Sequence, residues 1–211
     1  MKGLFAVDGP LVSFAIKLFD CMCLSVLWLV FSLPIVTMGA SSAALYLTVY
    51  NYIRKDRGKL WNTFWDAFKE NLKRSTILWL FSLALMTLLT VDVMVFRNMK
   101  INGDPLGGVY PVMLIVYCIA VTWLVYLTAY SAKFNGGIKD VLKFSFVLMV
   151  IHPIRAFGVF IPVICGIIIA LTIPGLIIIL PSGIFWACSF TLEKVFLLHM
   201  RQEDIEKVNN E

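Results

Sequence analysis

Charged residues are scarce in this 211-residue chain. Asp, Glu, Lys and Arg make up 15% of it, against about 25% in a typical soluble domain. Hydrophobic residues reach 60% and the mean hydropathy is +0.88. A soluble fold of this size would lack the polar surface to cover itself, and a chain this apolar does not have the composition of disorder. The sequence therefore predicts an integral membrane protein.

The recognisable motifs of catalysis are also missing. The chain has no G-x-x-x-x-G-K-[ST] phosphate loop, no H-E-x-x-H pair and no nucleophile elbow. His152 and His199 lack the spacing of zinc ligands, and the five cysteines fall in apolar stretches where they act as small hydrophobic residues. We predict a protein that is not an enzyme and needs no cofactor or metal. Its basic pI is explained by charge at the inner leaflet, so we expect no nucleic-acid partner.

Long uncharged intervals indicate the membrane spans. Residues 75–96, interrupted only by Asp92, and residues 105–132 suit one crossing each, since a crossing needs about 20 residues. Residues 21–53 and 156–192 are too long for one helix, and prolines interrupt both. We therefore predict an all-α polytopic bundle of about six helices, at residues 16–36, 39–55, 75–97, 108–133, 154–173 and 182–200. It forms a single transmembrane domain over residues 1–211, with a polar cytoplasmic tail at 201–211.

Lys and Arg set the expected orientation. With six spans, 16 of these residues lie on the side of both termini and 2, Arg97 and Lys100, lie on the other. Because cytoplasmic loops hold the excess of Lys and Arg, we predict a plasma-membrane protein with both termini in the cytoplasm. A five-span alternative crosses the membrane once over residues 21–53 and places the N-terminus outside.

Residues 59–74 form the most informative polar segment. Their aromatic residues recur with helical spacing opposite a charged face, which predicts an amphipathic helix at the cytoplasmic interface. Two interpretations stay open: a lipid anchor, or a docking surface for a partner. The candidate docking residues are Trp61, Phe64, Trp65, Phe68, Asn71 and Lys73.

A second amphipathic segment, residues 137–151, follows the fourth predicted helix. The halves 16–97 and 108–200 thus share the order span, amphipathic connector, span. Internal repeats of this kind are common in transporters, although any chain that crosses repeatedly needs connectors. The sequence leaves both interpretations open.

Small residues and two carboxylates complete the set of candidates. Pro34 and Gly39 are predicted to bracket a turn, and the pair Gly39 and Ala43 lets helix backbones approach closely. The close approach serves either packing within the chain or a seam between copies, so the oligomeric state stays open. Asp20 and Asp92 lie near helix ends, either as interfacial carboxylates or as functional groups in the membrane.

Two segments carry a resemblance to a known family. Residues 31–46, with the motif Leu-Pro-Ile-x-Thr-x-Gly, and residues 64–76 resemble the YesL family of bacterial membrane proteins, formally a domain of unknown function. The resemblance implies a polytopic protein of Gram-positive bacteria, often encoded beside carbohydrate ABC importers, and no known catalytic residue. It favours an accessory or partner subunit of such an importer. The alternative is an autonomous small transporter or channel.

Overall fold

The computed structural model describes residues 10–55, 57–134 and 136–199, so the predicted tail at 201–211 lies outside the described residues. Every regular element in these ranges is helical, which confirms the all-α prediction. The α-helices are α1 (Pro10–Ser32), α2 (Met38–Thr48), α3 (Leu60–Ile101), α4 (Tyr110–Lys133), α5 (Ile138–Ile151), α6 (Pro153–Thr172) and α7 (Leu180–His199). Short helical turns connect them: η1 (Ile35–Thr37), the π-helical η2 (Val49–Arg54), η3 (Pro105–Val109) and η4 (Pro174–Ile178).

Four segments in the described ranges are long and apolar enough to cross a membrane, and together they make the chain an all-α membrane bundle. They are Ala15–Ser32, Leu60–Ile101, Pro105–Lys133 and Pro153–Thr172. By length and hydropathy four helices qualify, where the sequence predicts about six spans. The second predicted span falls on α2 and on η2, which continues it without a gap; their 17 residues extend at most about 25 Å against a hydrocarbon core of about 30 Å. The sixth falls on α7, which is not among the four.

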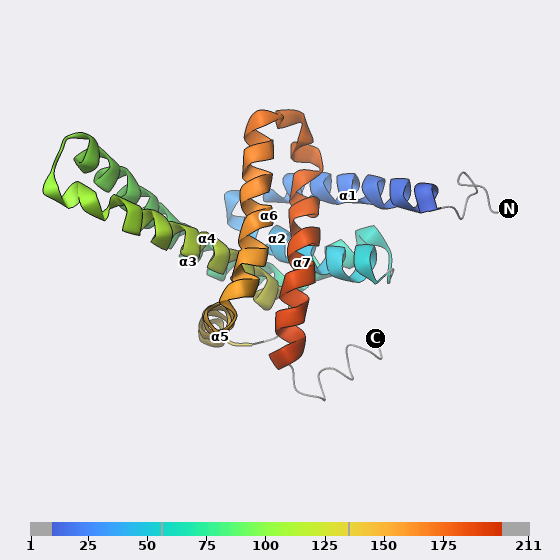
Figure 1. The fold of residues 1–211 in the computed structure, drawn as a ribbon. Helices are drawn as coiled ribbons and strands as arrows, with labels where there is room; N and C mark the ends of the chain where they lie inside the picture. The colour runs from blue at the N-terminus through green and yellow to red at the C-terminus, as the bar shows by residue number, and fades with distance from the viewer. Residues whose placement is uncertain (1–9, 56, 135, 200–211) are drawn as a thin grey trace.

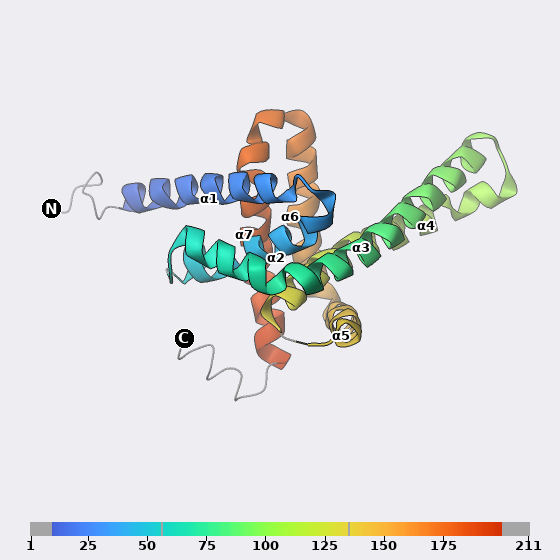
Figure 2. The same ribbon diagram turned by 180° about the vertical axis from the view of Figure 1, so that it is seen from behind.

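The helices diverge from a common centre at α2. Figure 1 shows the α6–α7 hairpin upright, α1 running across it, and the α3–α4 hairpin extending to the opposite side from the start of α1. The reverse view in Figure 2 gives the same arrangement. α2 packs against α1, α3, α4 and α7, so this short helix joins the longer ones.

The turn between α1 and α2 is built around Pro34. Pro34 has an extended backbone (φ −74°, ψ 113°), which ends α1 and directs the chain into η1. The Thr37 hydroxyl donates to the carbonyl oxygens of Phe31 and Pro34, at 2.7 and 2.9 Å. These bonds close the turn and return the chain into the protein as α2.

Gly39 and Ala43 lie on the packed side of α2, where the backbone approaches α3. A Cβ atom at Gly39 would stand 2.4 Å from the Cβ of Trp79 and 2.6 Å from the carbonyl oxygen of Ser75. Real Cβ atoms do not come this close, so the position requires glycine. Ala43 is fully buried in the core cluster that also contains Tyr46.

α3 is one continuous helix of 42 residues, about 63 Å long. The sequence predicts a helix over 59–74 and a separate span over 75–97, and the structure joins the two. Residues 60–101 contain neither glycine nor proline, so nothing in the local chemistry ends the helix between them. The amphipathic segment is therefore the first third of a membrane helix.

Candidate functional site

The inward face of the start of α3 holds three of the six predicted docking residues. Phe64, Phe68 and Asn71 are only 1%, 6% and 2% exposed. The ring of Phe31, at the end of α1, lies 5.8 Å from the ring of Phe64 and 5.1 Å from that of Phe68. These contacts fix the start of α3 against α1 and α2, so the three side chains support the helix from within.

The other three lie toward the outward face of the same helix, with Trp65 at its boundary, since its ring also lies 5.4 Å from that of Phe31. Trp61 is 54% exposed and stacks on the half-buried Trp65, with ring centroids 6.4 Å apart. The Lys69 ammonium lies 4.8 Å from the centroid of the Trp65 ring, and Lys73 is exposed one turn further on. We call Trp61, Trp65, Lys69 and Lys73 the outer stripe of α3. It combines flat aromatic area with positive charge.

Asn71 links the inward face to α4. Its side-chain amide donates to the Ala67 carbonyl oxygen at 3.0 Å, and its Oδ1 accepts a bond from Arg74 Nη2 at 3.0 Å. The same Arg74 nitrogen donates to the carbonyl oxygen of Ser131 on α4. Asn71 therefore orients the Arg74 guanidinium, which joins α3 to α4. Because the Asn71 side chain is buried and bonded in this way, a docking partner could hardly reach it.

A second polar site surrounds Glu193 on α7. Its Oε1 accepts a bond of 2.7 Å from the Tyr46 hydroxyl, and its Oε2 forms an ion pair with Lys133 at the end of α4. The Lys133 ammonium also lies over the ring of Tyr50. The side chains of Lys133 and Glu193 are 7% and 4% exposed. A buried charge is tolerated when it is paired and hydrogen-bonded, and this carboxylate has both the Lys133 ammonium and the Tyr46 hydroxyl as donors.

Further cations lie beside this pair. Arg54 Nη1 donates to the carbonyl oxygen of Ser189 at 3.0 Å, and its guanidinium carbon lies 4.3 Å from the centroid of the Phe190 ring. The Lys55 ammonium lies 4.6 Å from the Tyr50 ring, the same distance as the Lys133 ammonium on that ring. Burial lowers the pKa of Lys55, and the neighbouring Arg57 and Lys133 lower it further. The site is thus electropositive.

No local sequence pattern singles out the cluster of Glu193, Lys133, Tyr46 and Tyr50. One signal was available: Lys133 and Glu193 each end a long uncharged interval, so each lies close to the apolar interior. Their pairing joins positions 60 residues apart and depends on how α4 and α7 pack, which a single sequence does not display.

The two acidic candidates have different surroundings. Asp20 Oδ2 accepts a bond of 3.2 Å from the Tyr52 hydroxyl of η2, so it ties α1 to the end of the second helix. Asp92 is half-buried on α3. Within the described part of the chain, no group of three or more His, Cys, Asp or Glu side chains is placed to hold a metal ion.

Together the fold and these sites define a helical membrane protein built on a tightly packed α1–α2–α3 unit. Residues 21–93 of the chain match the model of a family described as a protein of unknown function, DUF624. The match covers the second half of α1, all of α2 and most of α3, including the Phe31 cluster and Gly39. It supports placing this segment in an uncharacterised domain family. No curated protein and no solved structure matched the chain.

Proposed function

We propose that this chain is a non-catalytic subunit of a plasma-membrane assembly and that it docks a partner through the outer stripe of α3. The observation that supports this is the division of one helix into two faces. Phe64, Phe68 and Asn71 are buried and hold the helix, whereas Trp61 and Lys73 point outward. In this proposal both termini lie in the cytoplasm, as the distribution of Lys and Arg predicts.

The two tryptophans of the outer stripe are of the residue type that forms interface hot spots, and a few such anchors usually carry most of the binding energy. The two lysines add positive charge beside them. Trp61 and Trp65 are already stacked, and the buried face beneath them fixes the backbone. A partner would therefore meet a preorganised surface and would lose little conformational entropy on binding.

The identity of the partner comes from the resemblance to the YesL family. Members of that family are often encoded beside carbohydrate ABC importers, so we propose a subunit of such an importer as the partner. The docking residues reduce to Trp61, Trp65 and Lys73, because the other three predicted residues are engaged inside the chain.

The experiment is co-purification in mild detergent at matched expression. We compare the wild type with the double variant Trp61→Ala/Lys73→Ala, and use Phe157→Ala as the control, since Phe157 is an aromatic residue of α6 that is 65% exposed. We expect the double variant to lose at least about tenfold of the co-purified importer subunit, equal to about 1.4 kcal/mol. If no importer subunit accompanies the wild type, or the control loses as much, the proposal fails.

A second candidate function, an autonomous small transporter, is favoured by the buried pair of Lys133 and Glu193. Ionisable groups buried in membrane bundles often mark ion pathways. The test uses proteoliposomes with an internal pH-sensitive dye under a potassium diffusion potential. A transporter that uses Glu193 predicts proton flux in the wild type that is lost in Glu193→Gln. Equal signals from both proteins and from empty liposomes would reject it.

A further inference from the structure

Two cations at the end of η2 lack an acidic partner among the described residues. Arg54 bonds only to the carbonyl oxygen and hydroxyl of Ser189, apart from its ring contacts, and Lys55 contacts the ring of Tyr50. Glu193 forms its ion pair with Lys133 and accepts a bond from the Tyr46 hydroxyl, so its direct contacts are made to other groups. The segment 54–57 reads Arg-Lys-Asp-Arg and so has a net charge of +2.

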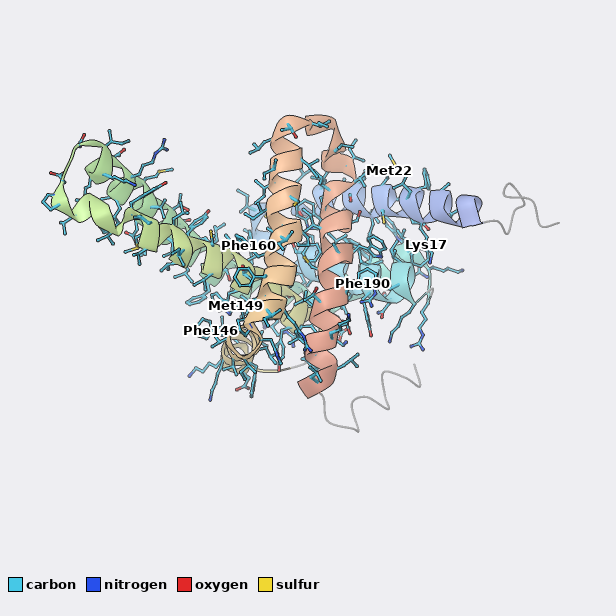
Figure 3. All side chains as sticks on the ribbon, in the orientation of Figure 1. Lys17, Met22, Phe146, Met149, Phe160 and Phe190 are labelled. Carbon is cyan, nitrogen blue, oxygen red and sulfur yellow. The ribbon has the colours of Figure 1, made fainter. Side chains whose placement is uncertain are left out.

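An exposed aromatic surface adjoins these cations. Phe190, over which Arg54 lies, is 44% exposed, and so is Trp186 one turn earlier on α7. Their ring centroids are 5.3 Å apart. Figure 3 shows Phe190 on the side of α7 that faces away from α6, so the hairpin does not cover this ring. Positive charge and apolar rings therefore share one edge of the molecule.

This combination matches the boundary of a lipid bilayer. Tryptophan and other amphipathic aromatic residues sit at the level of lipid headgroups, and basic side chains beside them attract anionic lipids. The guanidinium group is suited to phosphate because it can donate two parallel hydrogen bonds. A free phosphate ion would meet the same cations but would gain nothing from Trp186 and Phe190.

We propose that Arg54 and Lys55 bind the phosphate of an anionic phospholipid whose acyl chain lies along Trp186 and Phe190. The bound anion offsets the repulsion between Lys55, Arg54 and Lys133, which lie around the single ring of Tyr50. The lipid would also join the end of η2 to α7, at the place where Arg54 already bonds Ser189. This site is separate from the outer stripe of α3 and does not depend on a protein partner.

The test measures lipid retention by native mass spectrometry after delipidation in detergent. The probes are phosphatidylglycerol and phosphatidylcholine with identical acyl chains. We expect the wild type to bind phosphatidylglycerol at least about tenfold more tightly. Each cation near an anionic headgroup contributes about fivefold, so Lys55→Gln should lose about fivefold and Arg54→Gln/Lys55→Gln about 25-fold.

The matched control removes two other cations. Arg97→Gln/Lys100→Gln changes the far end of α3 by the same charge and should keep the preference for phosphatidylglycerol. Arg54→Lys preserves the charge but loses the paired hydrogen bonds of the guanidinium, so its affinity should lie between that of the wild type and that of Arg54→Gln. Trp186→Ala should weaken phosphatidylglycerol binding.

Three outcomes would overturn the proposal. The first is equal affinity for the two lipids. The second is an equal loss of affinity in the Arg97→Gln/Lys100→Gln control. The third is displacement of phosphatidylglycerol by millimolar inorganic phosphate with no effect of Trp186→Ala, which would assign the site to a free anion.

Discussion

The start of α3 and the helix α5 have a similar helical spacing of apolar residues but end in different ways. α3 continues from its amphipathic segment into a membrane span without interruption, whereas α5 ends at Ile151 and α6 begins at Pro153. His152, between them, has φ −118° and ψ 65°, outside the helical region, as expected for a residue that precedes proline. Pro153 separates the amphipathic helix α5 from the span α6, and α3 has no proline between its amphipathic segment and its span. The presence of proline, and not the amphipathic pattern, therefore decides whether the two segments form one helix or two.

The two helices also differ in what they bury. The start of α3 buries large aromatic residues against Phe31, whereas α5 buries Val141, Leu148 and Met149 and leaves Phe146 49% exposed. Trp123 of α4 stacks edge-on against Phe146. The rings of Phe64 and Phe68 are thus core in one helix, whereas the ring of Phe146 is half exposed in the other. The periodicity predicts that each helix has an apolar face, and the packing of neighbouring helices decides how much of that face is buried.

The largest expected effect tests this difference in burial. Phe68→Ala should lower the free energy of unfolding by about 3–5 kcal/mol, because it leaves a cavity beneath Phe31, Phe64 and Trp65. Phe146→Ala should lower it by only about 1 kcal/mol, mainly through the lost ring contact with Trp123. Denaturant titration in detergent measures both. Equal losses would show that α5 is packed as firmly as α3.

The next effect tests continuity. Ser75→Pro places in α3 the kind of residue that separates α5 from α6, and should cost about 3 kcal/mol by removing a helical hydrogen bond. Ser75→Ala is the control, since the Ser75 hydroxyl is buried without a hydrogen-bond partner. The helical signal in circular dichroism and the midpoint of thermal unfolding should fall in Ser75→Pro but not in Ser75→Ala. A proline variant as stable as the alanine variant would mean that α3 is already broken there.

A smaller effect tests the close approach of α2 to α3. Gly39→Ala should cost about 1–3 kcal/mol, because the new methyl group overlaps Trp79 and the Ser75 carbonyl oxygen. The control is Gly108→Ala, where an added Cβ meets no atom within 4 Å. Thermal unfolding in detergent compares the two. If Gly39→Ala unfolds at the midpoint of the control, the helices are not in contact at this position.

The smallest effect concerns Pro153. Proline is favoured in the first turn of a helix, where its missing N–H would be without a helical partner anyway. Pro153→Ala should therefore change stability by less than about 1 kcal/mol. A loss above about 2 kcal/mol, measured by the same titration, would show that the break between α5 and α6 is under strain that proline relieves.

The sequence predicts the helical class, the turn at Pro34 and the amphipathic periodicity, because each depends on neighbouring residues. It does not predict that α3 is continuous, since a charged segment followed by an apolar one resembles a connector followed by a span. The helix is continuous because residues 60–101 contain no glycine or proline. Such an absence permits a continuous helix but does not by itself predict one.

The candidate sites show the same limit. The aromatic spacing identifies Trp61, Phe64 and Phe68 together, but only the position of Phe31 decides which of them face inward. Lys133 and Glu193 are far apart in the chain and pair only after α4 and α7 pack. Side-chain roles that rest on long-range packing cannot be obtained from local spacing.

The most direct test is a distance along α3. Spin-labelled unnatural residues at the exposed positions Asn62 and Leu88 leave the five native cysteines in place and are measured by pulsed electron resonance in lipid nanodiscs. A continuous, gently curved helix separates these positions by about 35–39 Å, from a rise of about 1.5 Å per residue. A helix lying in the interface and turning at right angles near Arg74 would give about 28 Å. A single narrow peak in the longer range is predicted, and a peak near the shorter distance would contradict it.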